Sequence, residues 1–238
     1  VGQRVTGLVN AVGRRIAAHD LQEWVELLSE GLDETDRLAI RTHHPRWIVA
    51  AYEKVLQENE VAQALEANNL APRPTLVMRP GLAEVEELAP AIPTVYSPFG
   101  AVLEGAPGDL AAVREGRAGV QDEGSQLVCL ALTRVEAPSG PWLDLCAGPG
   151  GKSALLAGLA RQRGEHLVAN EVAAHRAELV EQALAVYPPG TASVICSDGR
   201  DPEPVRRHAP FARIMVDAPC SGLGALRRRP EARWRRTP

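Results

Sequence analysis

A glycine-rich turn at residues 146–152 has the composition of a site that holds a nucleotide. It reads Cys-Ala-Gly-Pro-Gly-Gly-Lys and follows the apolar stretch 142–146, in which Asp144 is the charged residue. We expect a strand, a turn and a helix in that order, which directs the N–H groups of a helix N-terminus toward a ligand. Glycine lets the backbone approach that ligand closely, although an ordinary tight strand–helix turn would also account for the glycines alone.

The spacing within this turn argues against two common nucleotide motifs. A P-loop has four residues between its first glycine and its Gly-Lys pair, whereas Gly148 and Gly151-Lys152 lie closer together. The turn is also a poor dinucleotide-binding fingerprint, because no G-x-x-G spacing follows the first G-x-G.

Two acidic residues follow later apolar stretches. Glu171 comes directly after residues 167–170, where an acid in a nucleotide-binding fold can accept hydrogen bonds from both ribose hydroxyls. An acid favoured by the dipole of the next helix is the alternative. Asp198 lies in Ser-Asp-Gly-Arg, where it can bond an adenine amino group or simply form a turn.

Residues 217–222, Asp-Ala-Pro-Cys-Ser-Gly, place a carboxylate close to a thiol. A thiolate can act as a nucleophile in covalent catalysis, and a carboxylate can supply a proton or a hydrogen bond. Cys220 and Asp217 are therefore the candidate catalytic residues.

The elements that must position these residues alternate between strand and helix. We expect strands at 142–146, 167–170, 193–196 and 212–216, with helices at 152–161 and 173–185. This alternation predicts a parallel sheet with crossover helices, in the usual strand order 3-2-1-4. Ligands bind outside the carboxyl ends of such strands, and all the polar clusters described above fall at those ends.

Two of these segments closely resemble motifs of one enzyme family. The string DLCAGPGGK resembles the first motif, and DAPCSG the fourth, of the RsmB/Sun family of RNA cytosine-5 methyltransferases. Residues 119–126 resemble the V-Q-D-x-x-S segment that leads into the catalytic domain of that family. The resemblance implies a Rossmann-like class I methyltransferase fold that binds S-adenosylmethionine. The cofactor-binding residues that it implies are Cys146, Ala147, Gly148, Pro149, Gly150, Gly151, Lys152, Glu171, Asp198 and Asp217, with Lys152 steering the carboxylate of the methionine moiety.

The resemblance also implies that two cysteines have different roles in catalysis. C5 of cytosine becomes nucleophilic enough to take a methyl group only after a thiolate has added to C6. In the family that thiolate comes from a later motif, typically T-C-S, while the cysteine that Cys220 matches helps to release the enzyme from the product. Asp217 would donate a proton to N3 of the cytosine or form a hydrogen bond with it. We therefore expect the main nucleophile beyond Pro238, and a fragment that is inactive and forms no covalent adduct.

The rest of the chain divides by composition into two further regions. Residues 1–68 show helical periodicity and loosely resemble the end of the NusB-like helical domain of the family, so an all-α remnant is expected there. Residues 72–135 are rich in proline and predict a small α+β subdomain, which the family implies to be RNA-recognition-like. Residues 136–238 form the expected, C-terminally incomplete cofactor-binding domain.

Composition limits the class of protein. Of 238 residues, 45% are hydrophobic and 24% are charged, with a net charge of −4, which is typical of a globular protein with a proper core. There is no apolar run of membrane-spanning length, and no signal peptide is visible. Four cysteines without C-x-x-C spacing suggest reduced thiols in a cytoplasmic protein, without a disulfide frame or metal site, and we expect Cys129 and Cys196 to be buried. The basic segment 227–238 suggests contacts to RNA phosphates through Arg227, Arg228, Arg229 and Arg233, or else a solvated tail.

The function that these observations predict is methylation of cytosine C5 in RNA, giving 5-methylcytosine during rRNA processing. The expected substrate is 16S ribosomal RNA, at a single-stranded or looped cytosine. A DNA cytosine-5 methyltransferase with Cys220 as nucleophile is an alternative, although its first motif usually reads F-x-G-x-G. A non-catalytic RNA-binding assembly factor is a third hypothesis, against which the intact glycines and acids argue.

Overall fold

The contacts within a computed structural model, which describes residues 3–237, divide the chain into two units. Of the described residues, one unit contains 3–72 together with 222–237, and the other contains 73–221. Among the described residues, no helix is long and apolar enough to cross a membrane.

The first unit, called here the helical unit, consists of short helices. Their bounds are α1 Gln3–Ile16, α2 Leu21–Ser29, α3 Glu34–Thr42, α4 Arg46–Glu53, α5 Glu58–Ala67, the 3-10 turn η3 Leu223–Ala225 and α11 Ala232–Arg235. Asp20 caps α2 in a reciprocal capping box with Glu23, and the Asp33 side chain caps α3. The helical character expected for the N-terminal region is confirmed.

Residues 222–237 pack with these helices, although we assigned them to the cofactor-binding domain. Leu226 is only 1% exposed and lies in one hydrophobic cluster with Ile48, Val49 and Leu65. The boundary drawn at 136–238 therefore differs from the observed division, because burial of Leu226 draws the C-terminal segment onto the helices.

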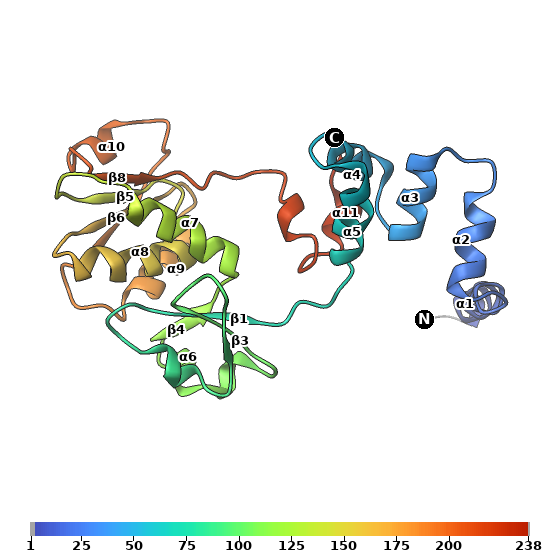
Figure 1. Ribbon diagram of the computed structural model, residues 1–238, viewed down its shortest axis with the longest axis horizontal. Coiled ribbons are helices and arrows are strands. Elements are labelled where there is room, and N and C mark those ends of the chain that lie inside the picture. Colours follow the sequence, from blue (N-terminus) through green and yellow to red (C-terminus); the bar gives the residue numbers. More distant parts are fainter. Residues whose placement is uncertain (1–2, 238) are drawn as a thin grey trace. The chain divides into compact units, whose positions relative to one another are not determined.

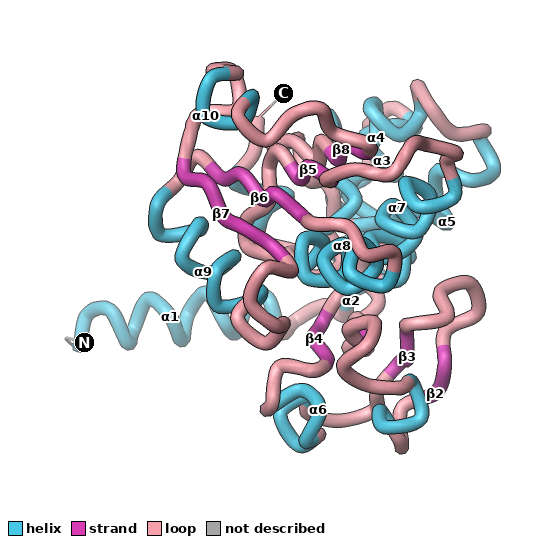
Figure 2. Tube along the Cα trace, turned by 90° about the vertical axis from the view of Figure 1, so that its left-hand side faces the viewer, coloured by secondary structure: helices cyan, strands magenta, loops and turns pink. Residues whose placement is uncertain are grey.

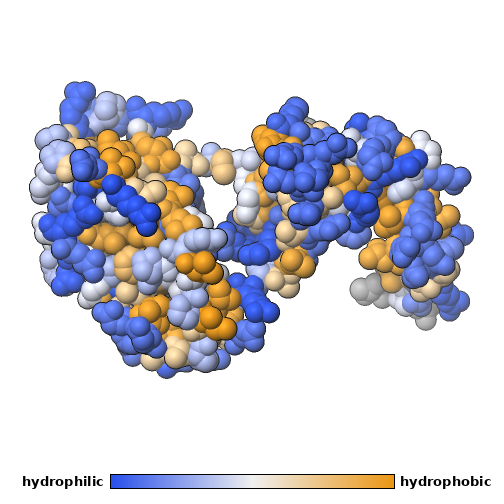
Figure 3. Space-filling view, in the orientation of Figure 1, coloured by the Kyte–Doolittle hydropathy of each residue, from blue (hydrophilic) through white to orange (hydrophobic). Residues whose placement is uncertain are grey.

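Apolar surface remains exposed on the first two helices, as the orange patches in Figure 3 illustrate. The large exposed side chains there are Val5, Leu8, Val9, Val12, Ile16, Leu21, Leu27 and Leu28. The core of the helical unit is built instead by α3, α4, α5 and the C-terminal segment.

The second unit begins with a small antiparallel sheet. Its strands β1 Thr75–Met78, β2 Ile92–Pro93, β3 Gly100–Val102 and β4 Ala118–Val120 lie in the order β2-β3-β1-β4. The 3-10 turns η1 Val85–Leu88 and η2 Pro107–Asp109 and the helix α6 Ala111–Arg114 accompany it. The small α+β subdomain expected at 72–135 is thus present. Leu76 and Met78 join one core on this sheet, whereas Val77 joins the core of the following domain, so both faces of β1 are covered.

A parallel sheet follows helix α7 Glu123–Arg134. Its strands are β5 Trp142–Asp144, β6 Leu167–Glu171, β7 Ala192–Cys196 and β8 Arg213–Met215, connected through α8 Gly151–Gln162, α9 Ala174–Leu184 and α10 Glu203–Arg206. All neighbouring pairs are parallel, and the order β7-β6-β5-β8, which Figure 2 shows, is the predicted 3-2-1-4. The Rossmann-like fold class is confirmed.

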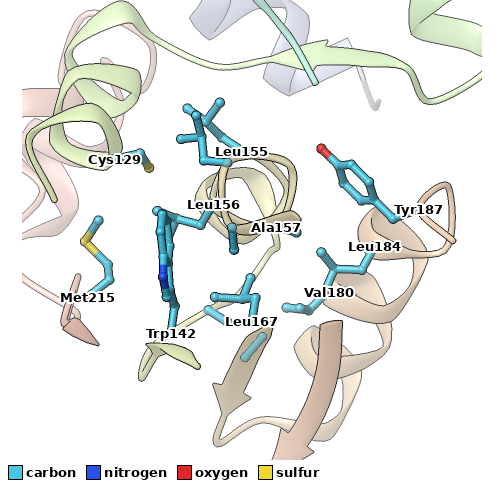
Figure 4. Close-up of a cluster of buried hydrophobic side chains, with 14 of the residues drawn as sticks. Cys129, Trp142, Leu155, Leu156, Ala157, Leu167, Val180, Leu184, Tyr187 and Met215 are labelled. Carbon is cyan, nitrogen blue, oxygen red and sulfur yellow. The ribbon is translucent and has the colours of Figure 1, made fainter. Parts of the chain in front are cut away.

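Helices cover both faces of this sheet (Figure 1). Residues of α7, α8 and α9 pack with Trp142, Leu167 and Met215 in the large core that Figure 4 shows. On the other face, Val205 of α10 packs against Leu143 and Val168. Alternation of side chains along each strand sends successive residues to opposite faces, so both faces are apolar.

A buried polar cluster supports the end of the sheet opposite the predicted site. Trp142 donates its indole N–H to Glu165 at 2.6 Å, and the guanidinium of Arg213 lies 5.0 Å from the ring centroid of Trp142. Glu165 and Arg213 also form a buried ion pair at 3.7 Å. These contacts tie the starts of β5 and β8 to the segment before β6.

Candidate functional site

A cavity of about 660 Å³ lies at the carboxyl ends of the four parallel strands. It brings together six of the residues that the sequence singled out, namely Cys146, Gly148, Glu171, Asp198, Asp217 and Cys220. They follow or end β5, β6, β7 and β8, so the topology gathers groups that are far apart in sequence. Ligands of open parallel sheets bind at this edge.

The glycine turn approaches Glu171 so closely that no side chain fits between them. The N–H of Gly148 donates to Glu171 Oε2 at 2.9 Å. A Cβ atom at Gly148 would lie 2.3 Å from the same oxygen. The other oxygen, Oε1, accepts from the N–H of Ala173 at 3.0 Å, and Glu171 is only 3% exposed. Backbone donors from the turn and from the start of α9 therefore hold this carboxylate in place.

Arg176 belongs to the site, although the sequence analysis did not select it. Its Nε lies 3.7 Å from Glu171 Oε2, and its Nη2 donates to the carbonyl oxygen of Gly148. The guanidinium thus offsets the charge of the buried carboxylate and holds the glycine turn from the other side. The sequence feature that could have identified Arg176 is its position as a basic residue in the first turn of the helix that follows Glu171.

Lys152 makes a contact that we did not predict. Its Nζ lies 2.7 Å from Asp217 Oδ2, so the first turn of α8 is joined to the segment after β8. We expected Lys152 to steer the carboxylate of a bound methionine moiety, whereas here it pairs with the candidate catalytic acid. Asp217 and Cys220 both line the cavity.

Asp198 carries its own counterion. Its carboxylate accepts from Arg200 Nε and Nη2, the latter at 2.5 Å, and from the backbone N–H of Arg200. Hydrogen bonds from the Arg200 side chain and backbone lower the pKa of Asp198 to about 2. The carboxylate is therefore ionised, and an acceptor, at any pH near neutrality.

The remaining residues of the glycine turn do not line the cavity. Gly150 has a φ of +105°, and a Cβ there would lie 2.8 Å from that of Ala183 in α9. Gly150 therefore allows α8 and α9 to pack closely, while Gly148 allows the approach to Glu171. Ala147 is buried, and Pro149 and Gly151 are outside the cavity wall.

The four cysteines have different surroundings, and one prediction about them was wrong. Cys129 is fully buried, as expected, and burial raises the pKa of its thiol to about 12. Burial, followed by the nearby carboxylates, also raises the pKa of Cys146, so neither thiol suits nucleophilic attack. Cys196, expected to be buried, is exposed at the end of β7. Cys220 is exposed and lines the cavity.

The structure removes one arginine from the predicted RNA-binding set. Arg233 is only 4% exposed and donates to Asn69 Oδ1 at 2.6 Å and to the carbonyl oxygens of Asn68 and His43 at 2.7 and 3.2 Å. It is a structural residue of the helical unit, because these acceptors surround it within the fold. Arg227, Arg228 and Arg229 are exposed.

Among the described residues, no group of His, Cys, Asp and Glu side chains could hold a metal ion. The polar groups of the residues that line the cavity are carboxylates, backbone groups, two guanidinium groups, the amide of Asn170 and two thiols. This combination suits a polar organic ligand with hydroxyl and amino donors.

Comparison with known proteins shows which family this part of the chain resembles. Residues 129–238 match the family described as 16S rRNA methyltransferase RsmB/F. This part of the chain is therefore similar to the RsmB/F methyltransferase family. A Mycobacterium tuberculosis protein named as a methyltransferase is 48% identical over 98% of this chain, which covers 52% of that protein. The ribosomal RNA small subunit methyltransferase B of Vibrio cholerae is 35% identical over 99% of the chain and 54% of its own length.

Solved structures agree with the fold of this chain. A methyltransferase homologue from Pyrococcus horikoshii has a TM-score of 0.63 at 20% identity, covering 82% of this chain and 66% of that one. NSun6 from the same organism has a TM-score of 0.59 at 12% identity, covering 75% and 71%. The chain spans about half the length of the curated relatives it matches.

Proposed function

We propose that the cavity at the carboxyl ends of β5 to β8 binds S-adenosylmethionine. The approach of the Gly148 backbone to the buried Glu171 carboxylate carries this proposal, because it forms a wall that only glycine permits. Glu171 would accept hydrogen bonds from the ribose hydroxyls, and Asp198 would accept from the adenine amino group. When bound, the sulfonium group supplies an electrophilic methyl group.

We further propose that the methyl acceptor is C5 of a cytosine in RNA, and that the substrate is small-subunit (16S) ribosomal RNA. The names of the family and of the Vibrio relative support an RNA substrate. Cytosine C5 needs a thiolate on C6 before it can accept a methyl group, and that covalent bond must break again after the transfer. Cys220, which lines the cavity, is our candidate for assisting this second step. Asp217, held by Lys152, would bond the N3 edge of the base.

The target base must leave its stack to reach such a cavity. Unstacking costs least in single-stranded or looped RNA, so we expect a cytosine in such a region. In this proposal the attacking thiol belongs to a later motif, and Cys220 assists release of the enzyme from the product. A DNA substrate gains no support from the relatives named above.

Calorimetry with S-adenosylhomocysteine, the demethylated product, tests cofactor binding. We expect Gly148→Ala to abolish binding, because its methyl group would overlap the Glu171 carboxylate. Gly124→Ala is the matched control, since a Cβ there meets no atom within 4 Å, and it should bind as the wild type does. The proposal would be contradicted if the wild type bound NAD as tightly as S-adenosylhomocysteine. It would also be contradicted if the wild type bound neither S-adenosylmethionine nor S-adenosylhomocysteine.

A further inference from the structure

Asn170, the residue before Glu171, connects three of the segments that form the cavity. Its side-chain Nδ2 donates to the carbonyl oxygens of Leu145 and Ser197, both at 3.1 Å. Its Oδ1 accepts from the hydroxyl of Ser197 at 2.6 Å. Asn170 is 1% exposed and lines the cavity, and its amide has a partner for both its donating and its accepting group.

These bonds begin where the main-chain ladder between β5 and β6 ends. The last register pair of these strands is Asp144 with Ala169. Beyond it, the Asn170 amide reaches Leu145, and the carbonyl oxygen of Asn170 accepts from the N–H of Ala147 at 2.8 Å. Asn170 therefore bonds the residues on both sides of Cys146, namely Leu145 and Ala147, and Ala147 is the residue directly before Gly148.

On the other side, toward β7, Asn170 bonds Ser197, the residue before Asp198. Ser197 donates its N–H to the carbonyl oxygen of Glu171 at 3.2 Å and bonds Asn170 through both its carbonyl and its hydroxyl oxygen. With three hydrogen bonds on one residue, the chain leaves β7 in a defined direction, and Asp198 is the next residue.

We propose that Asn170 is a positioning residue, which sets the geometry of the glycine turn and of Asp198 together. It would act through Gly148 and Asp198 rather than by contact with the reacting atoms. The inference rests on the proposed cofactor site. A buried amide suits this task because it can donate to two carbonyls and accept from a hydroxyl, whereas a carboxylate or an aliphatic side chain cannot.

The chain contains a matched control in Gln126. This amide is fully buried in the same unit, and its Nε2 donates to the carbonyl oxygens of Leu76 and Gln121 at 3.1 and 3.0 Å. Its Oε1 accepts from the hydroxyl of Ser97 at 2.5 Å. The hydrogen-bond pattern is that of Asn170, but Gln126 does not line the cavity.

The experiment compares Asn170→Asp with Gln126→Glu, two changes that keep the shape of the side chain and replace its donors by acceptors. Calorimetry with S-adenosylhomocysteine is done well below the unfolding temperature of each variant. We expect Asn170→Asp to raise the dissociation constant about tenfold or more, because two buried carbonyls lose their donor and face a carboxylate. Gln126→Glu should lower the unfolding temperature and leave the dissociation constant unchanged.

Hydrogen–deuterium exchange supplies a readout that needs no ligand. Asn170→Asp should speed exchange at residues 147–148 and 197–198 relative to Gln126→Glu. Normal affinity together with normal exchange in Asn170→Asp would overturn the inference. If the wild type does not bind S-adenosylhomocysteine, the proposed function fails. The hydrogen–deuterium exchange rates at residues 147–148 and 197–198 then decide by themselves whether Asn170 positions these segments. If Asn170→Asp does not fold, Asn170→Ala is measured for the same two effects.

Discussion

At the scale of single residues, the cavity contains two thiols in different settings. Cys146 lies between β5 and the glycine turn, where burial and the surrounding carboxylates raise its pKa. Cys220 is exposed, and both it and Asp217 line the cavity. Because Cys220 is exposed and lines the cavity, it is the thiol that we propose assists release of the enzyme from its product.

Replacement of Cys220 separates the two roles that a cysteine could have here. In a full-length protein that carries the attacking thiol of the proposed later motif, we expect Cys220→Ala to leave the bond to C6 intact and block release. The protein should then accumulate as a covalent adduct with its RNA, seen as a shifted band on a denaturing gel.

Cys196→Ala is the control, because that thiol is exposed outside the cavity wall and its replacement should trap no RNA. Loss of both adduct and methylation in Cys220→Ala would instead identify Cys220 as the nucleophile.

At the scale of elements, the helical unit contains a buried histidine, His44. His44 is 2% exposed, and its Nδ1 lies 2.6 Å from the carbonyl oxygen of Thr42. Asn68 Nδ2 approaches Nε2 at 3.4 Å, so the neutral ring that donates through Nδ1 fits this site. Burial, followed by the charge of Arg233, lowers the pKa of His44 to about 4.

This shift predicts that the helical unit loses stability in acid. Since the folded pKa lies below the unfolded value of 6.5, the unfolded chain takes up the proton first. Stability should be complete above pH 6.5 and fall toward pH 4, by at most about 1.4 kcal/mol per pH unit. Tryptophan fluorescence during urea unfolding can follow this change, because Trp24, Trp47 and Trp234 lie in the helical unit.

A variant without this histidine checks the assignment. His44→Gln should flatten the dependence between pH 6.5 and 4.5, whereas the exposed His175 should be replaceable by Gln without effect on it. A His44→Gln protein with the pH dependence of the wild type would show that other groups control acid unfolding.

At the scale of the whole molecule, the RNA binding that we propose would depend on local surface charge rather than on the net charge of −4. Arginines 227–229 form an exposed basic cluster. We expect their replacement by Ala to weaken binding of single-stranded RNA regardless of its sequence. The slope of log affinity against log salt should fall by roughly one unit for each phosphate that the variant no longer binds.

Arg206 and Arg207, exposed in and just after α10, supply the control for this prediction. Their replacement by Ala should leave the salt slope of RNA binding unchanged. An unchanged slope for the variant at 227–229 would mean that the cluster is a solvated surface that binds no phosphates.

Sequence alone was sufficient to predict the parallel sheet and the gathering of its polar residues at one edge. Alternating apolar stretches and amphipathic helices allow few topologies, and parallel strands of one sheet end on the same side. Glu171, Asp198 and Asp217 each follow such a strand, so their meeting in one cavity needed no knowledge of side-chain contacts.

The partners of these residues, in contrast, became known only from the folded chain. Arg233 looked like part of a basic surface, yet its acceptors come from residues more than 160 positions away in sequence. The exposure of Cys196 and the three-segment contacts of Asn170 are also invisible in local patterns. Periodicity describes the faces of one element at a time, whereas burial and hydrogen bonding depend on which distant element covers that face.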